Sequence, residues 1–140
     1  MLSSLLPDFP KITLHKTSEG YEVRDNEKKM KMTLSFDDYY KIILDNKSHQ
    51  LNRIVKANNL NILDCTGGFA RDATILASLG NVVTLIERNP LIMSLLINAR
   101  EKIKSDDIRS IFSKIKLRFG NCIDFINNTN KPVSYTHLTL

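Results

Sequence analysis

The sequence predicts an α/β fold, because strand-like and helix-like patterns alternate from Asn61 onward. Residues 62–65, 82–86 and 116–119 are short runs with strand character, and helical patterns separate them. Residues 11–36 instead show the apolar alternation and turn residues typical of antiparallel strands. The predicted architecture is a Rossmann-like core, incomplete in this chain, behind a small N-terminal β-rich appendage.

Composition limits the classes of protein to consider. The chain has 140 residues, 42% hydrophobic and 25% charged, which suits one globular domain and is too short for a two-domain enzyme. Its net charge of +5 favours an anionic partner such as RNA. No apolar run approaches the ~18 residues of a membrane span, and residues 1–10 lack the basic start of a signal peptide. The sequence therefore predicts a cytoplasmic protein without a membrane partner.

The two cysteines, Cys65 and Cys122, show no CxxC or Cys/His spacing, so no metal site is expected. They lie in separate parts of the chain, each near a strand end. The prediction for a cytosolic protein is two reduced thiols.

The appendage is expected to contain strands at 11–15, 21–24 and 32–36, with Gly20 at the first turn. Asp37 and Asp38 are predicted to cap a helix that runs to residue 44. Ser48 is predicted to cap a second helix that runs to residue 60.

Helix signals then alternate with the core strands. The first core helix is predicted at 70–79, ended by Gly80. The second begins with Asn89 as N-cap and Pro90 in the first turn. Its predicted apolar face consists of Ile92, Leu96, Ala99 and Ile103. Further helices are expected at 106–114 and 121–128.

A glycine turn follows the first core strand and an acid follows the second. Gly67 and Gly68 let backbone N–H groups approach a ligand, and Glu87 comes about 20 residues later, where an acid binds ribose hydroxyls. The G-x-G-x-x-G pattern of nicotinamide dinucleotide sites is absent. The turn fits better the D-x-T-x-G-x-G pattern of class I S-adenosylmethionine-dependent methyltransferases, with Ala70 in place of the last glycine.

A longer set of linked motifs resembles one family. The motifs are Asp64-x-Thr66-x-Gly68-x-x-Arg71-Asp72-Ala73, then Leu76-Ala77-Ser78-x-Gly80, then Glu87-Arg88-Asn89-Pro90. Together they resemble the RsmJ-type bacterial methyltransferases that modify guanine N2 in small-subunit (16S) ribosomal RNA. The resemblance is dense from about 61 to 96 and traceable from about 17 to 132.

The resemblance implies S-adenosylmethionine as cofactor and 16S rRNA in the small ribosomal subunit as partner. It also implies cofactor contacts at the charged pairs Arg71-Asp72 and Glu87-Arg88 and at the polar pair Asn121-Cys122. The full set of predicted cofactor-binding residues is Asp64, Gly67, Gly68, Arg71, Asp72, Glu87, Arg88, Asn121 and Cys122. Simpler interpretations are a helix-capping acid for Asp72, surface charge for the two arginines and a small buried residue for Cys122.

Three departures from the family pattern stand out. Gly67 stands where the family usually has alanine, and Ala70 stands where it usually has glycine. The alanine at residue 70 is tolerable if φ is negative there. The family's basic, glycine-rich stretch is not recognisable before the first core strand. The catalytic Asp-Pro-Met-Phe-Pro motif is absent, and residues 133–140 carry no acid.

These departures predict a C-terminally truncated chain, inactive alone. The expected divisions are a β-rich appendage with linker helix at 1–50, an incomplete cofactor-binding core at 51–132, and a tail not native to the family at 133–140. His137 in that tail is interpreted as incidental.

Two other functions remain open on the sequence. One is a fragment of a nicotinamide-dependent oxidoreductase, which the missing third glycine and the Arg-Asp pair disfavour. The other is a noncatalytic RNA-binding module, although no aromatic-basic RNA-recognition motif is present. Its phosphate contacts would come from basic residues, namely Lys28, Lys29, Lys31, Lys114, Lys116 and Arg118.

Overall fold

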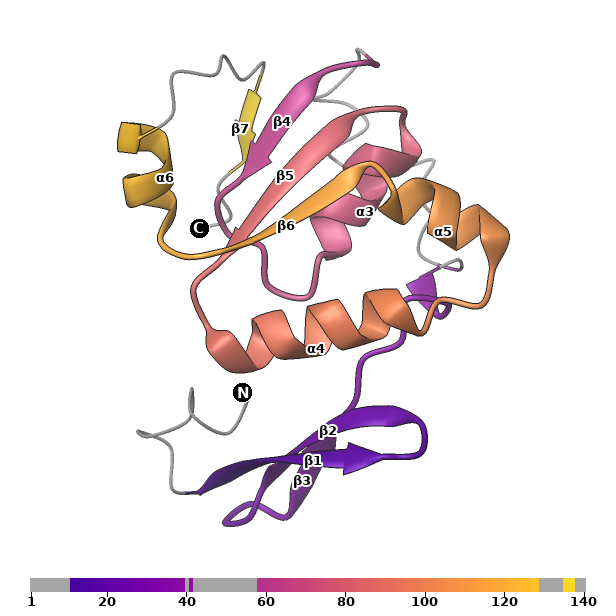
Figure 1. Cartoon of the computed structure of the whole chain (residues 1–140), viewed down its shortest axis with the longest axis vertical. Coiled ribbons are helices and arrows are strands. Elements are labelled where there is room, and N and C mark those ends of the chain that lie inside the picture. The colour runs from indigo at the N-terminus through magenta and orange to yellow at the C-terminus, as the bar shows by residue number, and fades with distance from the viewer. Residues whose placement is uncertain (1–10, 40, 42–57, 129–134, 138–140) are drawn as a thin grey trace.

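The computed structural model describes residues 11–39, 41, 58–128 and 135–137, and these form two sheets (Figure 1). The N-terminal sheet is antiparallel, with order β1 (Ile12–Thr17), β2 (Gly20–Asp25), β3 (Met30–Met32). The second sheet has the order β6 (Ile115–Phe119), β5 (Val82–Glu87), β4 (Asn61–Asp64), β7 (Tyr135–His137), and its pairings are all parallel. The helices are α3 (Arg71–Ser78), α4 (Pro90–Glu101), α5 (Asp106–Phe112) and α6 (Cys122–Asn128).

This arrangement confirms the predicted fold class. Strands β4 and β5 pair in parallel with Ile62 opposite Val83, and α3 makes the crossover between them. The segment 133–140 contributes β7, which pairs with β4 in parallel, Leu63 opposite Thr136. Its assignment as a tail foreign to the family stays a prediction.

The main core fills the space between the parallel sheet and its helices. Its members come from β4, β5 and β6 on one side and from α3, α4 and α5 on the other. Among the residues that are at most 1% exposed are Ile62, Val83, Leu85 and Ile115 from the strands and Ile75, Leu76 and Phe112 from the helices. This core fixes the carboxyl ends of the parallel strands, where the candidate site lies.

Helix α4 lies between the two sheets (Figure 1). Its Leu96 and Ala99 join the main core, while Leu91 and Leu95 pack with Val23 of β2. The Asn98 side chain also accepts a hydrogen bond from the Tyr21 backbone N–H at 3.0 Å. Only one apolar face was predicted for this helix, because local periodicity does not show which element the appendage packs against.

The predicted helix boundaries in the core are confirmed. The Asn89 side chain caps α4 by accepting from Leu91 N at 2.9 Å and Ile92 N at 3.4 Å, and Pro90 is the first helical residue. Gly80, with a φ of 93°, follows the end of α3. Glycine commonly ends a helix in this way, because it has no Cβ to strain the left-handed conformation.

The third appendage strand was predicted at 32–36, and this was wrong by several residues. Strand β3 ends at Met32, because the chain then turns away to bury Phe36, which is 1% exposed and stacks on Phe112 at 3.9 Å. The Asp37 carboxylate accepts from the backbone N–H groups of Lys104 and Ser105, so it ties this segment to the α4–α5 loop.

The helices predicted after Asp37 and Ser48 lie almost entirely outside the described residues. Within the described part of the chain, no helix is long and apolar enough to cross a membrane.

Candidate cofactor site

The glycine turn after β4 is pressed against the end of β5. Asp64, 2% exposed, accepts hydrogen bonds from the Thr66 backbone N–H at 3.0 Å and from its hydroxyl at 3.4 Å. The Gly67 N–H donates to the Ile86 carbonyl at 3.2 Å. A Cβ on Gly67 would lie 2.4 Å from Leu85 Cδ2 and 2.9 Å from the Ile86 oxygen. Only glycine therefore fits at residue 67 without a shift of the turn or of β5.

Glu87 ends β5 with its carboxylate held from two sides. Its Oε2 accepts from Gly68 N at 2.9 Å, and its Oε1 accepts from Asn89 N at 2.6 Å. The residue is only 9% exposed. Each carboxylate oxygen has about two lone-pair sites, so each keeps capacity for a further donor. The acid is thus fixed in position and able to accept from a ligand.

Ala70 adopts φ 61°, in the left-handed region, and precedes the first residue of α3. The condition set for its tolerance, a negative φ, is therefore not met. Its N–H donates to the Gly67 carbonyl at 2.8 Å, and its methyl group is fully buried. Packing around the turn thus holds an alanine where glycine would be less strained.

Tyr39 supports the turn from outside the sheet. Its hydroxyl donates to the Phe69 carbonyl at 2.7 Å. Burial raises the pKa of Tyr39 to about 12, against the opposing charge of Arg71. The phenol therefore stays protonated and donating throughout the neutral range. No local sequence signal identified this contact, which joins residues 30 positions apart.

A cavity of about 350 Å³ opens beside the turn at the carboxyl ends of β4, β5 and β6. Five predicted site residues line it, namely Gly68, Glu87, Arg88, Asn121 and Cys122. Cys65, Thr66, Ile86 and Gly120 complete the lining and were not predicted as site residues. Their position next to a strand end was the available signal, because parallel strands bring such residues to one edge.

The cavity has two walls of different origin. The turn wall comprises residues 65–70, between β4 and α3, and the helix wall comprises residues 120–122, between β6 and α6. Glu87 lies at the end of the strand between them. The helix wall is joined to it by the Gly120 N–H, which donates to the Glu87 carbonyl at 3.0 Å.

The remaining predicted site residues do not line this cavity. Asp64 and Gly67 shape the turn, as described above. Arg71 and Asp72 are the first two residues of α3, whose N-cap position is Ala70, and Asp72 lies in the first turn, where a carboxylate is favoured by the helix dipole. Their role in binding stays a prediction.

A larger hollow of about 510 Å³ lies between α4 and β6. Its lining is mainly apolar and consists of Met93, Ile97, Arg100, Glu101, Leu117 and Phe119. The cavity beside the glycine turn is the better candidate, because several polar groups and a fixed buried carboxylate converge there.

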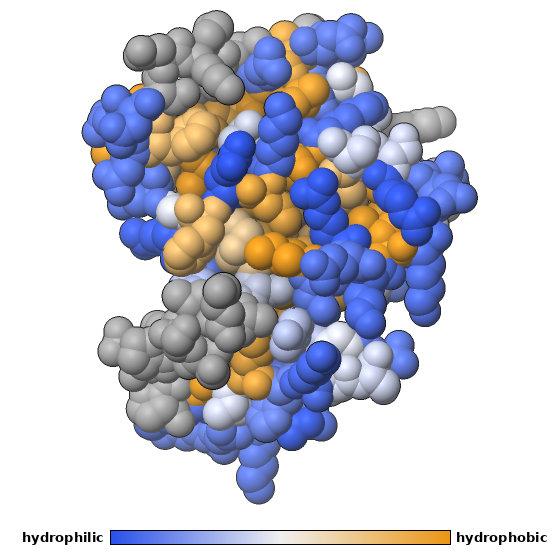
Figure 2. Space-filling view, in the orientation of Figure 1, coloured by the Kyte–Doolittle hydropathy of each residue, from blue (hydrophilic) through white to orange (hydrophobic). Residues whose placement is uncertain are grey.

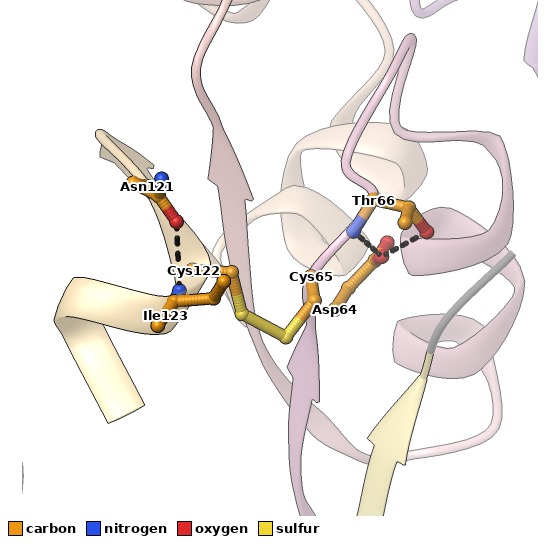
Figure 3. The surroundings of a disulfide bond; sticks show 6 residues. All are labelled: Asp64, Cys65, Thr66, Asn121, Cys122 and Ile123. Atoms are coloured by element: carbon orange, nitrogen blue, oxygen red, sulfur yellow. Dashed lines mark hydrogen bonds between the residues drawn. A yellow bond between two sulfur atoms is a disulfide. The ribbon is translucent and has the colours of Figure 1, made fainter. Parts of the chain in front are cut away.

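The prediction of two reduced, separate thiols is wrong for this structure. Cys65 and Cys122 form a disulfide between the turn wall and the helix wall, with Cα atoms 5.4 Å apart (Figure 3). The two residues are 57 positions apart in sequence. The prediction failed because β4 and β6 flank β5, which brings their following residues together at one edge of the sheet.

No cluster of three or more His, Cys, Asp or Glu side chains in the described residues is arranged to hold a metal ion.

Residues 8–138 match the model of a protein family described as "Putative SAM-dependent methyltransferase". The chain belongs to this family. The predicted cofactor, S-adenosylmethionine, is the one that the family description names, and the predicted class I methyltransferase fold is confirmed.

Curated relatives support the same assignment. The chain is 46% identical over 68 residues to a "Ribosomal RNA small subunit methyltransferase J" from Ectopseudomonas mendocina (strain ymp). It is 40% identical over 79 residues to the protein of that name from Pseudomonas syringae pv. syringae (strain B728a). These matches cover 48% and 55% of this chain but only 26% and 29% of the relatives.

A solved SAM-dependent methyltransferase from Neisseria gonorrhoeae has the same fold. The TM-score is 0.75 at 22% identity, over 96% of this chain and 63% of that chain.

Proposed function

We propose that this chain carries the S-adenosylmethionine-binding part of a methyltransferase that modifies guanine N2 of 16S rRNA in the cytoplasm. The observation that carries the proposal is the buried Glu87 carboxylate, fixed by two backbone N–H groups at the edge of a cavity that the glycine turn also lines. An acid at the end of the second strand accepts from the two ribose hydroxyls of a nucleotide-type cofactor.

The cavity fits such a cofactor in chemistry and in place. Gly68 and Gly120 present backbone without side chains, and a Cβ on Gly120 would meet nothing within 4 Å. Arg88 and Asn121 add polar groups around the carboxylate. When bound, S-adenosylmethionine supplies an electrophilic methyl group on its sulfonium. The residues of this chain bind and orient the nucleoside end of that molecule.

Support for RNA as the methyl acceptor comes from the names of the relatives and from charge. Lys28, Lys29 and Lys31 are exposed on the appendage, and Lys116 and Arg118 are exposed on the edge strand β6. Hydrophilic residues cover much of the face seen in Figure 2, with apolar residues between them. Surface cations neutralise RNA phosphates and give salt-dependent affinity.

The test of cofactor binding is calorimetry of this chain with S-adenosylhomocysteine, in reducing buffer, against NAD. The 140 residues contain no Asp-Pro-Met-Phe-Pro motif, so binding rather than turnover is the readout. We expect S-adenosylhomocysteine to bind and NAD not to bind. The reverse result would replace the proposal with an oxidoreductase.

The role of Glu87 is tested by Glu87→Ala, which should weaken binding by about 1–3 kcal/mol through the loss of charge-assisted hydrogen bonds. Glu101→Ala removes the same charge from an exposed position on α4 and is the matched control. A 2′-deoxy analogue of the ligand should lose affinity for the wild type but not for Glu87→Ala. If both proteins lose equally, Glu87 does not bind the ribose. Thermal melting of the same samples separates a lost contact from unfolding.

A further inference from the structure

The disulfide crosses the candidate cofactor site. Cys65 follows β4 and Cys122 begins α6, directly after the loop that follows β6. Strand β5 lies between β4 and β6, so the link from Cys65 to Cys122 passes over the end of β5, where Glu87 lies. Both cysteines line the same cavity as Glu87.

The bond therefore sets the distance between the two walls of the cavity. The turn wall is fixed independently by hydrogen bonds to β5 and by Tyr39. The helix wall leads into α6, in which none of the residues is buried. Ile123 and Ile126 of that helix are 66% and 47% exposed. With little packing to hold α6, the covalent bond to Cys65 is a major restraint on the helix wall.

The bridged cavity is small among the cavities that bind small molecules. Its volume of about 350 Å³ lies near the lower end of the ~300–1,000 Å³ range of small-molecule sites. The two sulfur-bearing residues are themselves part of its lining. Separation of the walls would enlarge the space next to Glu87 without disturbing the main core, which contains neither cysteine.

We propose that Cys65 and Cys122 form a reversible thiol–disulfide pair that controls entry to the cofactor cavity. The disulfide holds the helix wall close to the turn wall, and reduction to two thiols lets the walls separate and admits the cofactor. This inference rests on the proposed function. Disulfides that form in cytosolic proteins are usually transient and redox-sensing.

The chemistry needs a disulfide oxidant of low molecular weight, such as oxidised glutathione. One cysteine thiolate attacks a glutathione sulfur, forms a mixed disulfide and releases one glutathione thiolate. The second cysteine thiolate attacks the protein sulfur of that mixed disulfide and releases the second glutathione thiolate. Two protein thiols lose two electrons and two protons, and one oxidised glutathione becomes two reduced molecules. A dithiol reductant reverses both exchanges.

The test compares the affinity of S-adenosylhomocysteine for the full 140-residue chain after treatment with dithiothreitol and after treatment with oxidised glutathione. Thiol titration on each sample reports two free thiols or none. We expect at least tenfold tighter binding to the reduced chain. Equal affinity in the two states, or tighter binding to the oxidised chain, overturns the switch alone. Absence of binding in both states overturns the proposed function, and the switch with it.

Two variants, Cys65→Ser and Cys122→Ser, remove the bond from either wall. For each, the ratio of affinities with and without oxidant should fall to one, whatever the absolute affinity. A persistent oxidant effect in either variant overturns the assignment of the pair.

A measurement on the wild type alone covers the case in which the variants do not fold. Coupling between two equilibria is reciprocal, so a ligand that prefers the reduced chain must also favour its thiols. Saturating S-adenosylhomocysteine should shift a glutathione redox titration so that the disulfide needs a more oxidising mixture to form. An unshifted titration overturns the switch.

Discussion

The two walls of the cofactor cavity are built in opposite ways. The turn wall contains the fully buried Ala70 and is tied to β5 and Tyr39 through the Gly67, Gly68 and Phe69 backbone. The helix wall adjoins Phe119, which is 57% exposed, and leads into α6, which buries none of its residues. A site that binds a nucleoside needs one fixed surface for orientation, while the opposite surface can move to admit the ligand. We therefore predict that substitutions which break the contacts of the turn wall cost stability and that substitutions of exposed residues in α6, beside the helix wall, do not.

The largest effect is expected from Gly67→Ala. The new methyl group would lie 2.4 Å from Leu85 Cδ2 and 2.9 Å from the Ile86 backbone oxygen. Overpacking of this kind costs about 1–3 kcal/mol, and we expect the upper part of that range. Urea denaturation measures the loss.

The control for Gly67→Ala is Gly68→Ala, whose nearest neighbour is at 3.6 Å and whose cost comes from a φ of 46° alone. That conformation costs an alanine about 1–2 kcal/mol. If Gly68→Ala is the more destabilising of the two, the turn is not pressed against β5 as described.

A smaller loss is expected from Tyr39→Phe, which removes the hydrogen bond to the Phe69 carbonyl. The cost should be about 0.5–1.5 kcal/mol. Tyr21→Phe on β2 is the matched control for loss of a phenol. Equal effects of the two changes would show that Tyr39 does not support the turn wall.

Tyr39 also makes the stability of the protein depend on pH. The folded pKa of Tyr39, about 12, lies above its ordinary value of 10.0. The folded state therefore binds the proton more tightly, and the stability linked to this group is fully present below pH ~10 and is lost as the pH rises from ~10 to ~12. Denaturation curves through that window should show the decline in the wild type and a smaller decline in Tyr39→Phe.

Ala70→Gly should change stability by less than about 0.5 kcal/mol. Relief of the left-handed conformation offsets the loss of a buried methyl group and the added freedom of the unfolded chain. The same change at Ala77, which is also fully buried but lies within α3, should cost about 1–2 kcal/mol. Thermal or urea denaturation of Ala70→Gly and Ala77→Gly measures both effects. Equal losses of stability would refute the left-handed φ at residue 70.

The smallest effect is expected in α6, directly after the helix wall, from Ile123→Ser. The side chain is 66% exposed, so its replacement should alter stability by no more than about 0.5 kcal/mol. A loss above about 1 kcal/mol in urea denaturation would show that α6 is packed against another surface, and the contrast between the walls would be wrong.

Local patterns in the sequence predicted the parallel core because each signal lies within a few residues. Asn89 and Pro90 mark a helix start by their own hydrogen-bonding chemistry, and Gly80 marks a helix end. The third appendage strand was misplaced, since Phe36 leaves the strand pattern to fill a distant core. Five of nine predicted site residues line one cavity, and their binding role stays a prediction until ligand measurements are made.

The sequence by itself determined the α/β class, the order of the core elements and the glycine turn with its acid, because periodicity, caps and turn residues act locally. Only the tertiary structure decided which residues from distant parts of the sequence come into contact. It placed Cys65 against Cys122, the Tyr39 hydroxyl against the Phe69 carbonyl, and Leu95 of α4 in contact with the appendage. Such contacts depend on which strands are neighbours and on which distant segments pack into the same core. No short stretch of sequence carries that information.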